Sequence, residues 1–191
     1  MCGCSKDKIK GIETTQWGPH FWNILHFFSL KAGTSPPAVH AEELRIWTRI
    51  FQLTGKAIPC EECRKHYHEW FEAHPVIFKG MPYASVASFV QNWWFALHNN
   101  INILNDKPVF DFADLQTTYG SVDVLFELAT ITNYINKAAA ASQVKISDYK
   151  AWKSEILVLK SRYYWFCMIT SWLLHLRREA ADYPASTIQC A

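Results

Sequence analysis

Two cysteines separated by two residues form the part of this sequence best suited to chemistry. Cys60 and Cys63 enclose a pair of glutamates, and Pro59 interrupts the chain just before them, at the expected start of a helix. The N-terminus of a helix presents unpaired backbone N–H groups and the positive end of the helix dipole, and both favour a thiolate. Two cysteines on that turn can close and reopen a disulfide. The spacing therefore favours a redox-active pair.

Two other interpretations of this pair stay open at this point. The cysteines could supply half of a zinc site, completed by His66 and His68 or by Cys2 and Cys4, or they could be inert buried thiols. Structural zinc sites generally take four ligands from two short clusters. Four ligands crowded into one short helix make a poor tetrahedral cage, so we expect no metal site.

A second cluster follows one face of a predicted helix. Trp94, His98, Asn102 and Asn105 are four, four and three positions apart, which places them on the same side. Polar side chains on an otherwise apolar helix need buried partners, and a planar organic ligand with many hydrogen-bonding atoms would supply them. The alternative is a helix end that frays into solvent, where asparagine is common.

A third cluster pairs Trp22 with His26 at the same helical spacing. A tryptophan and a histidine on an apolar helix face are more often core residues than ligand contacts. Taken alone, this cluster therefore favours ordinary packing.

The elements that must position these residues are helical. Apolar side chains recur at helical spacing, proline and glycine separate the segments, and no strand pattern of useful length competes. The first four segments, joined by short breaks, predict an all-α protein built on a four-helix bundle. We expect helices over residues 17–30, 39–53, 61–73, 83–104, 112–119, 122–141 and 147–180.

Composition and charge exclude several classes of function. Half of the residues are hydrophobic and 15% are aromatic, so a sizeable core can form. The net charge is +2 and the basic residues are scattered, which argues against a nucleic-acid-binding face. Residues 163–176 carry no formal charge apart from His175, yet this segment is too short to span a membrane. The first residues include no targeting segment, which predicts a cytosol-like compartment where paired cysteines are rarely structural.

The three clusters together form an ordered signature. Trp-Gly-x-x-x-Trp-x-x-Leu-His begins at Trp17, Pro-Cys-x-x-Cys-x-x-His begins at Pro59, and His-Asn-x-x-Asn begins at His98 and is followed by Lys107-Pro108. Over about residues 17–110 this signature resembles the Erv/ALR family of FAD-linked sulfhydryl oxidases. It looks most like the versions encoded by large DNA viruses.

The resemblance implies a four-helix bundle that holds FAD at one mouth, usually in a homodimer. It implies an FAD-binding domain over residues 15–110, a helical extension over 111–191, protein thiols as substrates and O2 as the acceptor, with hydrogen peroxide as product. Cys63 would face the flavin and Cys60 would exchange with substrate. The implied cofactor-binding residues are Gly18, Trp22, His26, Tyr67, His98, Asn99, Ile101, Asn102, Asn105 and Lys107.

The ends of the chain are less constrained. We expect residues 1–14 to be a flexible tail whose Cys2 and Cys4 act as a shuttle disulfide, although they could instead be exposed or lipidated thiols. Tyr119 stands where a family helix often supplies a tryptophan, and residues 111–113 lack a cysteine that many members carry. We expect Cys167 to be a buried free thiol and Cys190 to lie in a loose tail.

The runner-up function is non-enzymatic. In that hypothesis the chain is a helical zinc-binding or interaction module that uses Cys60 and Cys63 as ligands. The expected location is cytoplasmic, at virus assembly sites of a host cell, or in the virion.

Overall fold

The protein is helical throughout the part that the structure describes. The computed structural model describes the backbone of residues 13–180 and the side chains of residues 13–164, and no strand occurs among them. The expected all-α class is confirmed. The α-helices are α1 (Thr14–Ser29), α2 (His40–Ala57), α3 (Glu61–Ala73), α4 (Val86–Leu104), α5 (Leu115–Tyr119), α6 (Val124–Ala140) and α7 (Ile146–Ala180), and the short 3-10 helices are η2 (Pro37–Val39), η3 (Tyr83–Ser85) and η4 (Phe112–Asp114).

Local signals explain where several helices begin. Asp123 caps α6, because its carboxylate accepts hydrogen bonds from the backbone N–H groups of Leu125 at 3.0 Å and Phe126 at 3.1 Å. Glu13 and Gln16 form a capping box at the start of α1, so this helix begins three residues before the expected position.

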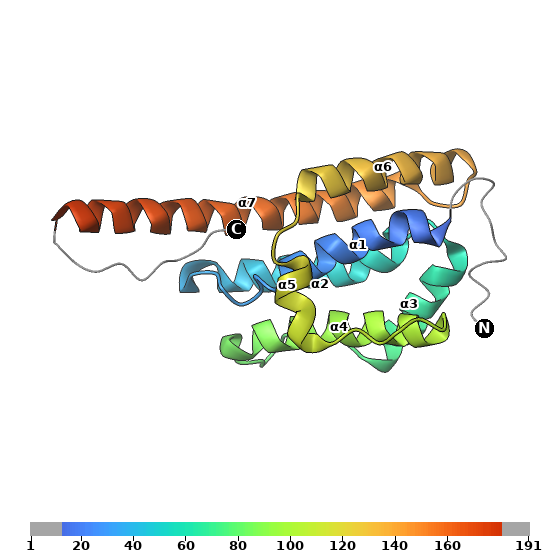
Figure 1. Ribbon diagram of the computed structural model, residues 1–191, viewed down its shortest axis with the longest axis horizontal. Coiled ribbons are helices and arrows are strands. Elements are labelled where there is room, and N and C mark those ends of the chain that lie inside the picture. Colours follow the sequence, from blue (N-terminus) through green and yellow to red (C-terminus); the bar gives the residue numbers. More distant parts are fainter. Residues whose placement is uncertain (1–12, 181–191) are drawn as a thin grey trace.

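The helices form three layers (Figure 1). α1 and α2 lie in the middle, α4 lies on one side of them, and α6 and α7 lie on the other. α1 can occupy the middle because apolar side chains surround it: Phe21, Ile24, Leu25 and Phe28 are all buried. A helix that is apolar on more than one face must be covered on more than one face.

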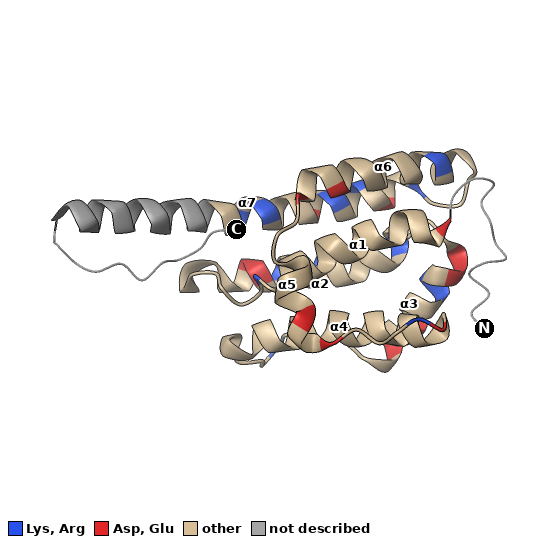
Figure 2. Cartoon of the chain, in the orientation of Figure 1, with Lys and Arg blue, Asp and Glu red and all other residues tan. Residues whose placement is uncertain are grey.

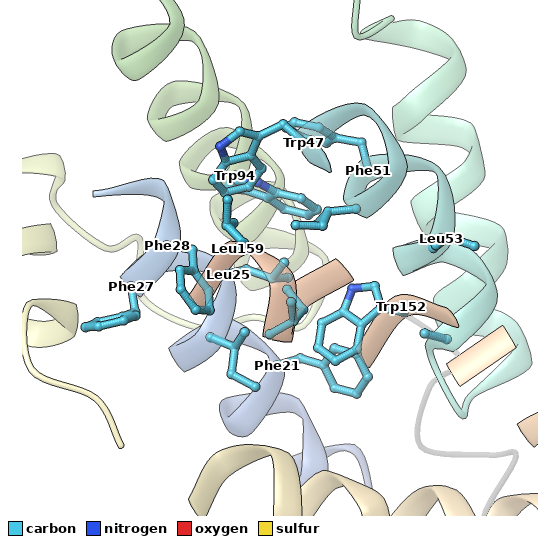
Figure 3. Close-up of a cluster of buried hydrophobic side chains, with 14 of the residues drawn as sticks. Phe21, Leu25, Phe27, Phe28, Trp47, Phe51, Leu53, Trp94, Trp152 and Leu159 are labelled. Carbon is cyan, nitrogen blue, oxygen red and sulfur yellow. The ribbon is translucent and has the colours of Figure 1, made fainter. Parts of the chain in front are cut away.

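One hydrophobic core joins the layers (Figure 3). Trp152 of α7 is fully buried, and its ring centroid lies 4.9 Å from that of Phe21 on α1. Ile131 and Ile135 of α6 are also fully buried in this core. The core is therefore continuous across residue 110, and the domain boundary expected there stays a prediction.

A buried carboxylate ties the layers together at the end where α1 runs into α2. Glu43 is fully buried and accepts hydrogen bonds from the Gly33 backbone N–H at 2.8 Å, the Tyr163 hydroxyl at 2.6 Å and the Tyr83 hydroxyl. Gly33 has a φ of +74°, in the left-handed region that favours glycine. This network links the α1–α2 turn, η3 and α7.

Charged residues of both signs are spread along the helices rather than gathered on one face (Figure 2). Within the described residues, no helix is long and apolar enough to cross a membrane. Cys2, Cys4 and Cys190 lie outside the described residues, and Cys167 lies in the stretch of α7 whose side chains are not described.

Candidate active site

The Cys60–Cys63 pair forms a disulfide at the N-terminus of α3. The two Cα atoms are 5.2 Å apart, within the usual range for a disulfide. Cys60 is the N-cap residue, and its sulfur accepts a hydrogen bond from the Cys63 backbone N–H at 3.2 Å. The Arg64 guanidinium donates to the Ile58 carbonyl at 2.8 Å, which fastens the preceding segment to the helix. The local sequence therefore places both sulfurs at the positive end of the α3 dipole.

This arrangement favours redox chemistry over zinc binding. Zinc requires thiolate ligands, whereas the sulfurs of Cys60 and Cys63 are bonded to each other. Among the side chains of residues 13–164, no group of three or more His, Cys, Asp or Glu could hold a metal ion, while Cys2 and Cys4, the other ligands considered, lie outside the described residues.

A pocket of about 380 Å³ opens beside the disulfide. Its walls come from α1 as far as Leu25, the end of α2, the start of α3, the second half of α4, the loop that carries Lys107 and the end of α5. Cys63 lines this pocket, whereas Cys60 does not and is only 8% exposed. Most of the sequence-predicted cofactor residues line it too: Gly18, Trp22, Tyr67, His98, Ile101, Asn102, Asn105 and Lys107.

Stacked rings form the wall between α1 and α4. Trp22 and His98 stack with centroids 4.1 Å apart and planes 8° from parallel. His26 lies behind them, fully buried, with its Nε2 2.9 Å from His98 Nδ1. Tyr119 of α5 stacks on His26 at 4.5 Å and also lines the pocket. The predicted clusters on the first and fourth helices therefore meet in one layer of rings.

Both histidines are held neutral. Burial, with a smaller contribution from His98, lowers the pKa of His26 to about 3. Burial and the nearby Lys107 ammonium lower the pKa of His98 to about 4. Two neutral imidazoles that share one hydrogen bond leave the pocket wall uncharged, so Lys107 supplies its positive charge.

Two buried nitrogens at this end have no hydrogen-bond partner among the described residues. They are Nδ1 of His26 and Nε1 of Trp94, and Trp94 lines the pocket. A buried polar atom without a partner carries a free-energy cost. An unpaired nitrogen on a pocket-lining residue, as on Trp94, is the arrangement expected where a polar ligand or water completes the site.

Asn99, expected to help hold the cofactor, does not line the pocket, and its role in binding stays a prediction. Its side-chain amide donates to the Phe110 carbonyl at 2.9 Å and accepts from the Phe110 N–H at 2.8 Å. Lys107 is held in the same loop, because its backbone N–H donates to the Asn102 carbonyl at 2.9 Å. Asn99 therefore fixes the loop that presents Lys107.

Tyr67 contributes its ring rather than its hydroxyl. The hydroxyl donates to the Phe51 carbonyl at 2.6 Å, and burial raises the pKa of Tyr67 well above its usual value. Gly55 makes room for this ring, since a Cβ at that position would lie 2.6 Å from a Tyr67 ring carbon. Burial of the hydroxyl leaves Tyr67 no acid–base role near neutral pH.

Sequence reasoning missed several lining residues. The polar ones that no motif marked are Thr14, Thr15, Asn23 and Thr54. Asn23 directly follows Trp22, a predicted cofactor residue, and this neighbour could have identified it as a pocket residue. Nothing near Thr54 in the sequence identifies it, because its place depends on where α2 ends against α3 and α4.

Comparisons with known proteins point in one direction. The sequence model of the "Erv1 / Alr family" matches residues 19–120. FAD-linked sulfhydryl oxidases from two isolates of African swine fever virus, Pig/Kenya/KEN-50/1950 and Tick/Malawi/Lil 20-1/1983, are each 26% identical over 103 residues, covering 54% of this chain and 79% of the relative. The Warthog/Namibia/Wart80/1980 isolate carries a similar protein at 25% identity. No solved structure matches the chain.

Proposed function

The chain belongs to the Erv1/Alr family, and we propose that it is an FAD-dependent sulfhydryl oxidase that transfers electrons from protein thiols to O2, releasing hydrogen peroxide. One observation carries the proposal beyond family membership. The Cys60–Cys63 disulfide stands at a pocket that Cys63 itself lines, together with Trp22 and His98. A redox disulfide and a site for a planar cofactor are thus neighbours.

The residues present fit FAD. The stacked rings of Trp22 and His98 suit a planar ring system, and the unpaired nitrogens of His26 and Trp94 lie at the same end. Lys107 offers a cation for phosphate oxygens. When bound, FAD supplies the two-electron acceptor between the reduced cysteine pair and O2.

Thiol exchange follows from the disulfide. A substrate thiolate attacks the sulfur of Cys60, the Cys60–Cys63 bond breaks, and Cys63 leaves as a thiolate that the α3 N-terminus stabilises. A second substrate thiolate then attacks the substrate sulfur of the mixed disulfide and releases Cys60. The substrate gains a disulfide and loses two protons, while the cysteine pair holds the two electrons.

Other parts of the proposal concern partners and location. We propose Cys2 and Cys4 as the shuttle pair and a homodimer as the assembly. The sides of α1 and α2 that α6 and α7 cover are not available to a second copy, so its contacts must use other surfaces. A cytoplasmic location at virus assembly sites, or in virions, stays a prediction.

The test compares Cys63→Ala with the unaltered protein. We expect the unaltered protein to purify with bound FAD and to consume O2 when dithiothreitol is added. Cys63→Ala should keep FAD but lose O2 consumption by roughly a thousandfold or more, because the disulfide no longer forms. Cys167→Ala, outside the motif, is the matched control and should retain turnover.

Two results would contradict the proposal. One is full turnover in Cys63→Ala. The other is a colourless unaltered protein that carries stoichiometric zinc, which would favour the zinc-binding module instead.

A further inference from the structure

Two helices beyond the family match contact the side chains that line the pocket. The match ends at residue 120, whereas α6 begins at Val124 and α7 at Ile146. α6 packs on α1, which supplies much of the pocket wall, and α7 packs on α2, which supplies Thr54. Each outer helix places one polar side chain against a pocket-lining residue.

Glu127 is the α6 residue. It is only 8% exposed, and its carboxylate is shared between two side chains of α1. Asn23 Nδ2 donates to Oε1 at 2.9 Å, and His20 Nδ1 contacts Oε2. Asn23 lines the pocket. Because the carboxylate occupies an amide N–H of Asn23, it fixes the rotamer of that pocket residue.

Trp152 is the α7 residue. It is fully buried, its ring packs on Phe21, and its indole N–H donates to the Thr54 hydroxyl at 3.0 Å. Thr54 in turn donates to the Ile50 carbonyl at 2.7 Å, so its single hydroxyl proton is already committed. Phe21 and Thr54 both line the pocket. Trp152 therefore positions two residues of the pocket wall, the apolar Phe21 and the polar Thr54.

We infer that Glu127 and Trp152 are positioning residues for the FAD pocket, acting through Asn23 and Thr54 from the outer layer of helices. The inference rests on the proposed FAD-dependent function. It gives α6 and α7 a part in cofactor binding, in addition to covering the core. Neither residue need touch FAD, because each acts on a side chain that lines the pocket.

The first experiment separates positioning by Glu127 from general stability. Apo-protein is titrated with FAD by flavin fluorescence at a temperature where circular dichroism shows every variant folded. Glu127→Ala should bind FAD about tenfold more weakly, since Asn23 loses its partner. Glu127→Gln keeps a carbonyl oxygen that can accept from Asn23, so it should regain most of the affinity.

Ile131→Ala is the matched control. Ile131 is fully buried one turn further along α6, so its truncation lowers the melting temperature without removing a hydrogen bond to Asn23, because the isoleucine side chain makes none. We expect its FAD affinity to stay within about twofold of the unaltered protein.

The second experiment removes one hydrogen-bond donor at each of two sites on α7. Trp152→Phe keeps a ring against Phe21 but loses the bond to Thr54, and we expect about threefold weaker FAD binding. Tyr149→Phe is its control. The Tyr149 hydroxyl bonds to Thr132 at 2.8 Å and to the Leu128 carbonyl at 3.2 Å, and neither residue lines the pocket. FAD affinity should be unchanged in this control.

The outcomes are distinguishable. Unchanged FAD affinity in both Glu127→Ala and Trp152→Phe would overturn the inference and leave the proposed function intact. The inference would also be overturned, with the proposed function intact, if the FAD affinities of all variants simply followed their melting temperatures. Failure of the unaltered protein to bind FAD would overturn the proposed function, and the inference with it.

Discussion

The two ends of the α1–α2 layer both bury polar side chains, but the central polar residue of each end is paired differently. Near Glu43, the Ser35 hydroxyl oxygen also lacks a partner among the described residues, so the difference lies at Glu43 and His26 themselves. At the end where α1 turns into α2, Glu43 receives a hydrogen bond from the Gly33 backbone and one from each of two tyrosines. At the pocket end, His26 shares one hydrogen bond with His98, while its second ring nitrogen and the indole nitrogen of Trp94 have no partner among the described residues.

The difference separates a structural network from a binding site. A buried polar group that is fully paired stabilises one arrangement of the chain and needs no further hydrogen-bond partner. A buried polar group left unpaired beside a cavity is costly in the free protein and gains a partner only when something enters. By this criterion Glu43 serves folding, and Trp94, whose unpaired indole nitrogen belongs to a pocket-lining residue, serves a ligand.

The largest expected effect is at the Glu43 end. Glu43→Ala should lower the free energy of unfolding by about 3–5 kcal/mol, because it removes the acceptor of the buried Tyr163 hydroxyl and of the Gly33 N–H and one of the two acceptors of the Tyr83 hydroxyl. Urea unfolding followed by circular dichroism measures this loss. FAD affinity of the folded variant should be unchanged, and a parallel loss of affinity would mean that the two ends are not independent.

The next effect belongs to the pocket end. FAD at a hundred times its dissociation constant should raise the free energy of unfolding of the apo-protein by about 2.7 kcal/mol. His98→Ala removes the ring that stacks on Trp22, so this gain should fall by at least about half at the same FAD concentration. Glu43→Gln is the control and should keep the full gain. If FAD stabilises His98→Ala as much as the unaltered protein, His98 does not contribute to FAD binding.

The smallest effect is the pH dependence at the pocket end. An unfolded histidine titrates near pH 6.5, whereas the pKa of native His26 is about 3, so below pH 6.5 protons bind mainly to the unfolded chain. His26 therefore lowers the free energy of unfolding as the pH falls from 6.5 towards 3, by about 1 kcal/mol between pH 6.5 and 5.5.

The comparison with His26→Gln isolates this contribution. Between pH 6.5 and 5.5 the free energy of unfolding of the variant should fall by about 1 kcal/mol less than that of the unaltered protein. Urea unfolding of the apo-protein at both pH values measures the difference. An identical pH dependence in the two proteins would show that His26 is not held neutral.

Local signals in the sequence predicted the helices well. The helix expected over residues 61–73 is α3, Glu61–Ala73, and the one expected over 147–180 is α7, Ile146–Ala180. Proline, glycine and capping residues act within one or two turns of the chain, so their effect can be seen without knowing the fold. The largest shift is at the end of α2, which was expected at Leu53 but continues through Gly55 to Ala57. α1 begins three residues before the expected position because of the capping box at its start.

The candidate site was predicted less evenly. Spacing placed Trp22, His98 and Asn102 on helix faces, and all three line the pocket. His26 and Asn99 share those helices but point into packing contacts, one against a ring stack and the other against the Phe110 backbone. Helical spacing gives the face of a residue, whereas the neighbouring helix decides whether that face meets a cavity.

The sequence by itself determined the all-helical class, the disulfide-forming pair at a helix start and the helix faces that carry Trp22, His98 and Asn102, because those features depend on short-range spacing and capping. Only the tertiary structure decided that Glu43 would be satisfied and His26 would not, and that Glu127 and Trp152 would reach the pocket wall. These contacts join residues about a hundred positions apart, and such pairs follow from how whole helices pack rather than from any local pattern.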